Sequence, residues 1–261
     1  SSEDSLATTA EYTSGHRLHM GYSFELLVDD FSAGYIRDTV SRLEAAMTEG
    51  WPCWAVSNHD VRRAVSRWGG DNPPPRLARM LVAMVCSLRG SVCLYQGEEL
   101  GLPEHTTLPD DARQDPTWFR SEGRERGRDG ARVPLPWTAD APSLGFGPGP
   151  ATWLPQPEDW ASLTAESQAD DDASMLALYR ALGTLRRAEP ALRGGDVEWL
   201  EQTATRLVLR RTPAAGVGGR ALTLVVNLGE EAAPLPDGEL LLATAPLVGG
   251  MLAGESAGVL A

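Results

Sequence analysis

The chain has 261 residues, 42% of them hydrophobic, which is enough for a sizeable core in one large or two ordinary domains. Its formal net charge is -13 and its pI is near 4.8. This acidity argues against nucleic-acid or anionic membrane partners, which bind basic patches, and no segment has the length and apolarity of a membrane span. We therefore predict a globular protein with no nucleic acid and no membrane as partner.

The first half of the chain alternates between predicted strands and helices. Leu18 to Val28 is rich in aromatic and aliphatic residues and predicts a strand, as does the apolar run from Cys53 to Asn58. Between them, the apolar residues Ile36, Val40, Leu43 and Met47 have helical spacing and predict a helix. Ser32 is its predicted N-cap and Gly50 its predicted end.

A second unit of the same kind follows. Three prolines, Pro73 to Pro75, start a predicted helix whose apolar face runs from Leu77 to Leu88 and which Gly90 closes. Ser91 to Tyr95 predicts a short buried strand. Two successive β/α units followed by a third strand predict a parallel sheet.

Residues 106–172 break this rhythm, because Pro, Gly, Trp and charged residues replace apolar periodicity. The segment carries six aromatic side chains: Trp118, Trp137, Trp153, Trp160, Phe119 and Phe146. Their flat faces suit stacking on a sugar ring, and they suit equally well the pinning of a long loop onto the fold.

After this segment, Asp172 predicts the cap of a helix whose apolar face includes Met175 and Leu185, with Pro190 just beyond its end. Four short strands follow, separated by Gly, Pro or polar turns, at 197–200, 206–211, 221–227 and 240–245. They predict a small antiparallel β domain with a boundary between residues 188 and 195.

Cysteine and histidine give little sign of redox or metal chemistry. The three cysteines, Cys53, Cys86 and Cys93, lie in apolar runs and predict buried free thiols in a reducing cytoplasm. The four histidines form no paired helical motif, so we predict no metal site.

The tripeptide Asn58-His59-Asp60 ends the second predicted strand, and alone it is typical of a turn or a helix cap. Its context extends through Arg63 to Ser66-Arg67-Trp68-Gly69. This run resembles the fourth signature region of the alpha-amylase superfamily (glycoside hydrolase family 13), particularly the alpha-glucosidase and oligo-1,6-glucosidase branch. Two further stretches, 90–101 (GSVCLYQGEELG) and 128–137 (RDGARVPLPW), resemble later family motifs in the same order.

The resemblance implies an α/β fold, in which a (β/α)8 TIM barrel is followed by a small antiparallel β domain. The motif order places the three predicted strands as barrel strands six to eight. Residues 1–190 would then form the C-terminal part of the catalytic barrel, with the aromatic-rich loop 106–172, and residues 191–261 the C-terminal β domain. A complete barrel takes about 250 residues, so the chain is expected to be a C-terminal fragment.

The family resemblance also implies a function, the retaining hydrolysis of alpha-glucosidic bonds in small alpha-glucosides without an organic cofactor. Its catalytic Asp and Glu belong to the fourth and fifth strands, and neither signature occurs here; we expect that the Glu precedes Ser1 and that this chain alone is inactive. Two alternatives stay open: a non-catalytic carbohydrate-binding or scaffold relative, and a transglycosylating glucosyltransferase of the same family.

Carried over residue by residue, the resemblance implies that Asp60 is the third catalytic carboxylate, which stabilises the transition state by binding the hydroxyls of the reacting ring. His59 would donate a hydrogen bond to the same ring. Arg63 and Arg67 join His59 as predicted substrate-binding residues; each would keep nearby carboxylates ionised, or form a structural salt bridge.

Other acidic residues of the motifs have simpler expected roles. Glu98 and Glu99 are adjacent, so their side chains tend to point apart, which favours loop anchoring over catalysis. Asp129 and Arg132 are expected either to contact substrate or to pair with each other.

Overall fold

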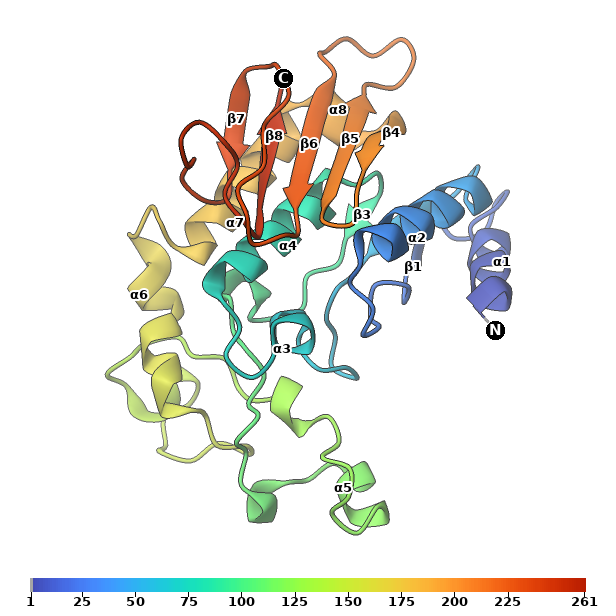
Figure 1. Ribbon diagram of the computed structural model, residues 1–261. Coiled ribbons are helices and arrows are strands. Elements are labelled where there is room, and N and C mark those ends of the chain that lie inside the picture. The colour runs from blue at the N-terminus through green and yellow to red at the C-terminus, as the bar shows by residue number, and fades with distance from the viewer. Residues whose placement is uncertain (1) are drawn as a thin grey trace. The chain divides into compact units, whose positions relative to one another are not determined.

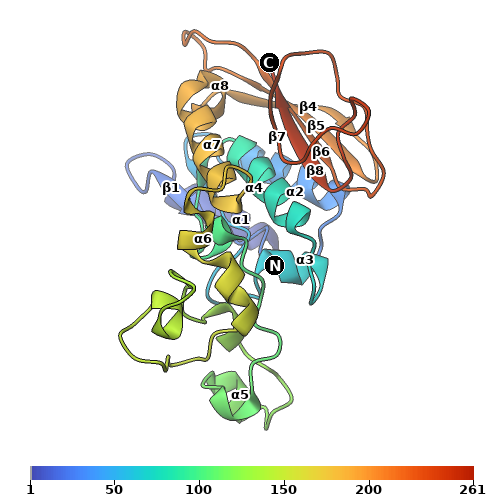
Figure 2. The ribbon, with the colours of Figure 1, turned by 90° about the vertical axis from the view of Figure 1, so that its left-hand side faces the viewer.

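The computed structural model describes residues 2–261, with side chains from Leu6 onward (Figures 1 and 2). The chain divides into two compact units. The first unit holds the residues up to Ala55, Arg79–Cys93 and Ala181–Ala261. The second unit holds Val56–Ala78 and Leu94–Arg180. The helix α7 (Met175–Ala188) passes from the second unit to the first.

The first unit contains a parallel sheet of three strands, as predicted. Strands β1 (Met20–Tyr22), β2 (Trp51–Trp54) and β3 (Ser91–Val92) are hydrogen-bonded in the order β1-β2-β3. The helix α1 (Ser2–Tyr12) precedes them, α2 (Ala33–Ala46) links β1 to β2, and α4 (Pro75–Ser87) comes before β3. The β/α rhythm inferred from the sequence is therefore confirmed.

All three strands are shorter than predicted. The run 18–28 contributes only three strand residues, β2 ends at Trp54 instead of Asn58, and β3 ends at Val92 instead of Tyr95. Ala55 to Ser57 are buried although they lie outside any strand. Apolar residues reveal burial, whereas a strand also requires a neighbouring backbone to pair with, so apolarity overestimated strand length.

The predicted N-cap of α2 is confirmed. The Ser32 hydroxyl accepts a hydrogen bond from the backbone N–H of Tyr35 at 3.2 Å, and Ile36, Val40 and Leu43 are buried along one face. The predicted cap of α7 is wrong. Ser174 caps this helix, because its hydroxyl accepts from the N–H of Ala177 at 3.0 Å, while Asp172 is exposed before the first turn.

The first unit also contains an antiparallel sheet, in the order β4-β5-β6-β8-β7. Its strands are β4 (Asp196–Gln202), β5 (Arg206–Thr212), β6 (Leu222–Asn227), β7 (Leu240–Ala243) and β8 (Ser256–Leu260), preceded by the short helix α8 (Pro190–Arg193). The four predicted strands are present, and β8 is an addition. Val208, Val225, Leu252 and Leu260 form its core cluster.

The second unit is built from short helices and loops. Its elements are α3 (Ala64–Gly69), η1 (Glu98–Leu100), η2 (Asp110–Ala112), α5 (Pro116–Arg120), η3 (Asp129–Ala131), η4 (Pro142–Gly145), η5 (Glu158–Leu163) and α6 (Ala165–Ala169). Trp160 is 1% exposed in a core cluster with leucines and Val133, so this aromatic side chain pins the loop. Phe119, Trp137, Phe146 and Trp153 are each about half exposed or more, and sugar stacking by them stays a prediction.

The three cysteines stand as thiols, and their burial differs from the prediction. Cys53 is buried, Cys86 is half-buried and Cys93 is exposed. Cys93 directly follows the last residue of the short strand β3. Among the described residues, no helix has the length and apolarity needed to cross a membrane.

Candidate active site

Asn58, His59 and Asp60 form a turn that begins four residues after β2 ends. The Asn58 side-chain oxygen accepts hydrogen bonds from the backbone N–H groups of Asp60, at 2.8 Å, and Val61, at 3.1 Å. Asparagine forms such turns readily because its short side chain mimics a backbone carbonyl. The turn leaves the Asp60 side chain 47% exposed, with His59 Nε2 3.4 Å from Asp60 Oδ2.

Two arginines bind the Asp60 carboxylate from a distant part of the sequence. Asp60 Oδ1 accepts from Arg128 Nη1 at 2.7 Å and from Arg132 Nη2 at 3.1 Å. The hydrogen bond from Arg128, opposed by partial burial and aided by the charges of His59, Arg128 and Arg132, lowers the pKa of Asp60. Asp60 is therefore a carboxylate at neutral pH.

Arg128 also joins Asp60 to a second, fully buried acid. Arg128 Nε donates to Asp115 Oδ2 at 2.7 Å, and Asp115 accepts further from the N–H groups of Arg128 and Thr117. Burial alone would raise the pKa of Asp115, but these hydrogen bonds outweigh it and hold the pKa far below its usual range. Arg128 was missed as a site residue, although it opens the third motif.

Asp129 and Arg132 take separate partners. The Asp129 carboxylate accepts from the N–H groups of Gln114, at 2.7 Å, and Asp115, at 2.9 Å. Arg132 binds the turn that carries Asp60, because its Nε also donates to the carbonyl oxygen of His59 at 2.8 Å. The side chains of Asp129 and Arg132 therefore do not pair with each other in the described structure, contrary to one of the two expected alternatives.

The two arginines predicted after Asp60 both bind backbone carbonyl oxygens. Arg63 is 1% exposed, and its Nη1 and Nη2 donate to Gln96 O at 2.9 Å and Ala131 O at 3.1 Å. Arg67 donates to Val56 O at 2.6 Å and Arg62 O at 2.5 Å. Their predicted contact with substrate stays a prediction.

Glu98 and Glu99 anchor the loop after β3, as predicted. Glu98 Oε2 accepts from the N–H of Tyr95 at 3.0 Å, and Glu99 Oε2 accepts from the N–H of Gly97 at 2.8 Å. Burial raises the pKa of Glu98 to about 7, against the hydrogen bonds that favour its ionised form. Glu98 Oε1 is buried with no hydrogen-bond partner.

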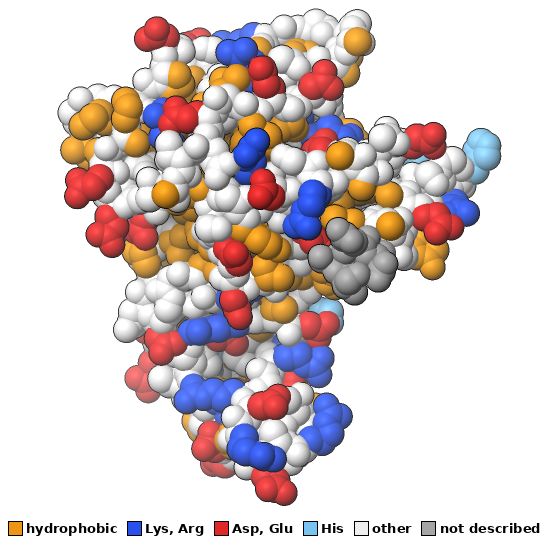
Figure 3. Space-filling view, turned by 45° about the vertical axis from the view of Figure 1, so that its right-hand side comes forward, with side chains coloured by type: hydrophobic (Ala, Val, Ile, Leu, Met, Phe, Trp, Pro, Cys, Tyr) orange, Lys and Arg blue, Asp and Glu red, His pale blue; other side chains and the backbone are white. Residues whose placement is uncertain are grey.

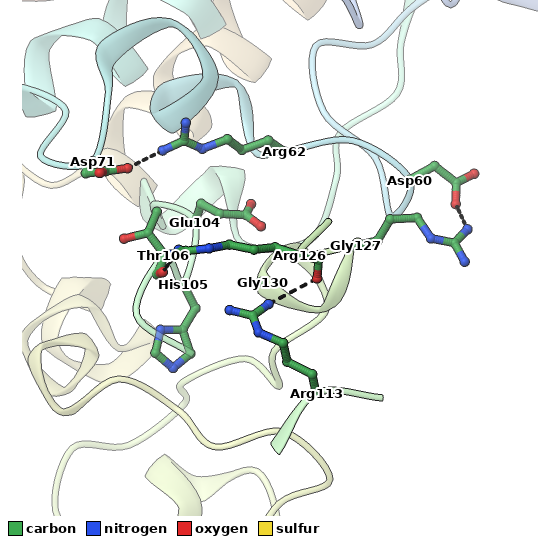
Figure 4. A pocket seen from close by; sticks show the side chains of 11 residues that line it. Asp60, Arg62, Asp71, Glu104, His105, Thr106, Arg113, Arg126, Gly127 and Gly130 are labelled. Atoms are coloured by element: carbon green, nitrogen blue, oxygen red, sulfur yellow. Dashed lines mark hydrogen bonds and ion pairs between the residues drawn. The ribbon is translucent and has the colours of Figure 1, made fainter. Parts of the chain in front are cut away.

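A cavity of about 230 Å³ opens beside Asp60 within the second unit (Figure 4). Around it, Arg62 pairs with Asp71 at 2.5 Å, and Arg126 donates to the carbonyl oxygen of Thr106. The other lining residues are Asp60, Glu104, His105, Arg113, Gly127, Arg128 and Gly130. Figure 3 shows basic and acidic side chains interspersed on the face of the molecule that it draws.

Such a lining offers both hydrogen-bond donors and acceptors, which suits a neutral ligand rich in hydroxyl groups. No group of three or more His, Cys, Asp or Glu side chains in the described part of the chain is arranged to hold a metal ion.

Two family models match the chain. The model for the alpha amylase catalytic domain matches residues 4–195, and that for a domain of unknown function, DUF3459, matches residues 193–259. A probable alpha-glucosidase of Rhizobium meliloti (strain 1021) is 37% identical over 235 residues, which are 89% of this chain and 41% of that protein. An oligo-1,6-glucosidase of Saccharomyces cerevisiae is 30% identical over 158 residues, 51% of this chain and 27% of that protein.

A solved structure resembles the whole chain. The structure of the alpha-glucosyl transfer enzyme XgtA has a TM-score of 0.85 and 49% identity, and the match covers 100% of this chain and 50% of that chain. This chain thus spans about half the length, or less, of the relatives it matches. The predicted fold class, the C-terminal part of a TIM barrel with an antiparallel β domain, is confirmed. The chain belongs to the alpha-amylase catalytic-domain family.

Proposed function

We propose that this chain is the C-terminal portion of a retaining alpha-glucosidase that acts on small alpha-glucosides. Residues 1–190 would complete the catalytic barrel, and residues 191–261 would form its C-terminal β domain. The observation that best supports this proposal is the ionised Asp60. It lies beside His59 and is bound by Arg128 and Arg132 at a polar cavity. The names of the two glucosidase relatives support this substrate class.

The role proposed for Asp60 follows from how its two oxygens are used. Both arginine hydrogen bonds go to Oδ1, whereas Oδ2 faces His59. Oδ2 therefore retains lone pairs that can accept hydrogen bonds from sugar hydroxyls, while His59 Nε2 can donate one to the same ring. A fixed negative charge stabilises the oxocarbenium-like transition state more than the neutral substrate.

Retaining chemistry also requires a nucleophile and an acid/base about 5 to 5.5 Å apart, and neither family signature occurs in these residues. We expect no turnover of a chromogenic alpha-glucoside by the 261-residue chain. If this chain does turn over the substrate, and Asp60→Asn abolishes that turnover, the conclusion that the chain lacks the nucleophile and the acid/base is contradicted. In a longer parent enzyme, the same substitution is expected to lower kcat by a factor of about 100 or more.

A second candidate function is alpha-glucosyl transfer, favoured by the 49% identity to an alpha-glucosyl transfer enzyme over the entire chain. Both reactions share the covalent glucosyl intermediate and differ in whether water or another hydroxyl compound accepts the sugar. Product analysis of the parent enzyme with an alpha-glucoside and an added alcohol acceptor separates them. Free glucose alone supports hydrolysis, and a glucosylated acceptor supports transfer.

A non-catalytic carbohydrate-binding relative gives a third pattern, in which the full-length protein binds sugar without any product. We also propose a cytoplasmic location, on the ground that all three cysteines stand as thiols. Non-reducing electrophoresis of protein from the native source tests this point, since it detects any intermolecular disulfide.

A further inference from the structure

Arg63 is a buried cation at the meeting point of three segments of the second unit. Its own backbone N–H donates to Glu104 Oε2 at 2.9 Å, Nη1 donates to Gln96 O, and Nη2 donates to Ala131 O. Burying a guanidinium is costly unless its donors are used. Here Nη1 and Nη2 donate to backbone carbonyls from two separate loops, while Nε is buried without a hydrogen-bond partner. A side chain used in this way fixes the position of those loops.

The Ala131 carbonyl is the contact that matters for the site. It accepts from Arg63 Nη2 at 3.1 Å and from the Tyr95 hydroxyl at 3.0 Å, while the Arg63 guanidinium lies 5.0 Å from the centre of the Tyr95 ring. Ala131 directly precedes Arg132 and ends η3, which begins just after Arg128. Holding this carbonyl therefore fixes the backbone of both arginines that bind Asp60.

We propose that Arg63, with Tyr95, is a positioning residue that sets Arg128 and Arg132 against Asp60 by holding the carbonyl oxygen of Ala131. The catalytic meaning of this placement rests on the proposed function, because Asp60 has a catalytic role only there. The placement itself does not depend on that function and can be tested without any turnover.

The surrounding residues leave space for this contact. Gly97 has a φ of +91°, and a Cβ at that position would lie 2.9 Å from Arg63 Nη1. A side chain at position 97 would therefore crowd the Arg63 guanidinium where it reaches the Gln96 carbonyl. The Ser66 hydroxyl accepts from the N–H of Glu104 at 2.9 Å, which in turn fixes the acid that receives the Arg63 N–H.

The test is the pKa of Asp60 in this 261-residue chain, followed by carbon-13 NMR of its carboxyl group. Its charged neighbours are His59, Arg128 and Arg132, with Asp115 on the far side of Arg128. In Arg63→Met, the two arginines lose their fixed backbone, so the pKa of Asp60 is expected to rise towards its ordinary value. Arg63→Lys, which cannot span both carbonyls, is expected to give an intermediate value.

Two controls separate positioning from the loss of a charge or of stability. Arg186→Met removes an arginine that binds the carbonyls of Cys86, Leu88 and Gly90 in the first unit, and is expected to leave the pKa of Asp60 unchanged. In an Arg128→Met background, adding Arg63→Met is expected to change the pKa less than it does in the wild type. An equal change in both backgrounds would overturn the proposal, since Arg63 would then act through its own charge.

Tyr95→Phe keeps the experiment decisive if Arg63→Met does not fold. It removes one donor to Ala131 without changing any charge, and is expected to raise the pKa of Asp60 by less than Arg63→Met does. An unchanged pKa in folded Tyr95→Phe, or in folded Arg63→Met, would overturn the proposal. An inactive parent enzyme would count against the proposed function and leave this titration as it is.

Discussion

Glu98 is an acid whose burial makes stability depend on pH near neutrality. Its pKa rises from 4.5 to about 7 on folding, because burial disfavours the charged form. The folded chain therefore binds more protons than the unfolded chain between these two pH values, and the free energy of unfolding falls as the pH rises through them.

Replacing Glu98 by Gln removes this dependence. We expect Glu98→Gln to raise the free energy of unfolding by about 1–3 kcal/mol at pH 8 relative to the wild type, and to gain little at pH 4.5. Urea unfolding at the two pH values measures the difference. A gain of the same size at both would show that ionisation of Glu98 has no part in it.

Asp115 has the opposite dependence, because its pKa is lowered on folding from an ordinary 3.8. The stability from its hydrogen bonds is present above that pH and is lost as the pH falls through the folded pKa. We expect Asp115→Asn to cost about 1–3 kcal/mol at pH 7, with the deficit narrowing below pH 3.8. Chemical unfolding of both proteins across this range measures it, and a deficit independent of pH would contradict the charge-based account.

Gly130 lies against the acid that receives the Arg63 N–H. A Cβ there would be 2.3 Å from Glu104 Oε1 and 2.9 Å from the carbonyl oxygen of His105. We expect Gly130→Ala to lower the free energy of unfolding by about 1–3 kcal/mol through overpacking. Gly147→Ala, whose Cβ would meet nothing within 4 Å, is the matched control with an expected change below about 0.5 kcal/mol. Equal destabilisation of both variants in thermal unfolding would show that the close contacts at Gly130 are not responsible.

At the scale of single elements, the cap of α7 gives a direct test. Ser174 accepts from the N–H of Ala177, so Ser174→Ala is expected to cost about 1 kcal/mol. Asp172→Ala is the control, because the sequence alone favoured this residue as the cap and it lies exposed. The free energies of unfolding of the two variants, measured in urea, should differ accordingly. A larger loss in Asp172→Ala would restore the original prediction.

Helices were more predictable than strands. The apolar spacing and the Ser32 cap located α2, and the proline run and Gly90 bracketed α4, because both signals are local in sequence. Strand β8 was missed, since its sequence Ser-Ala-Gly-Val-Leu lacks alternation and all five residues are buried. Small residues in a central strand carry no periodic signal.

The candidate site was predictable in part for the same reason. Asp60 and His59 followed from a local motif, and the loop-anchoring role of Glu98 and Glu99 followed from their adjacency. The pairing of Asp60 with Arg128 joins residues 68 positions apart and depends on the fold of the second unit. No spacing rule connects such residues, so Arg128 was found only from the structure.

At the scale of the whole chain, Arg211 of β5 connects the antiparallel sheet to the rest of the first unit. This side chain is fully buried, and it donates to Ser87 O at 2.6 Å, at the end of α4, and to Gly194 O at 3.0 Å. Burial lowers the pKa of Arg211 to about 10, so it stays charged at neutral pH. Its hydrogen bond to Ser87 thus joins two segments that lie far apart in the sequence.

We expect Arg211→Met to lower the free energy of unfolding by about 2–4 kcal/mol, because it leaves the buried Ser87 carbonyl and the partly buried Gly194 carbonyl without these donors. It should also separate the unfolding of the antiparallel sheet from that of the parallel sheet. Arg210→Met, on the same strand with a 45% exposed side chain, is the matched control. Scanning calorimetry distinguishes the outcomes, and a single sharp transition in Arg211→Met would contradict the connecting role.

The place of β8 in its sheet has a consequence for synthesis. This strand pairs with β6 on one side and β7 on the other, although both precede it in the chain. While a ribosome is still making residues before Ser256, β6 and β7 have no partner between them and expose open backbone edges. β7 can join the nascent sheet only after β8, the strand between β6 and β7, has left the exit tunnel, so chaperone protection matters most in that interval.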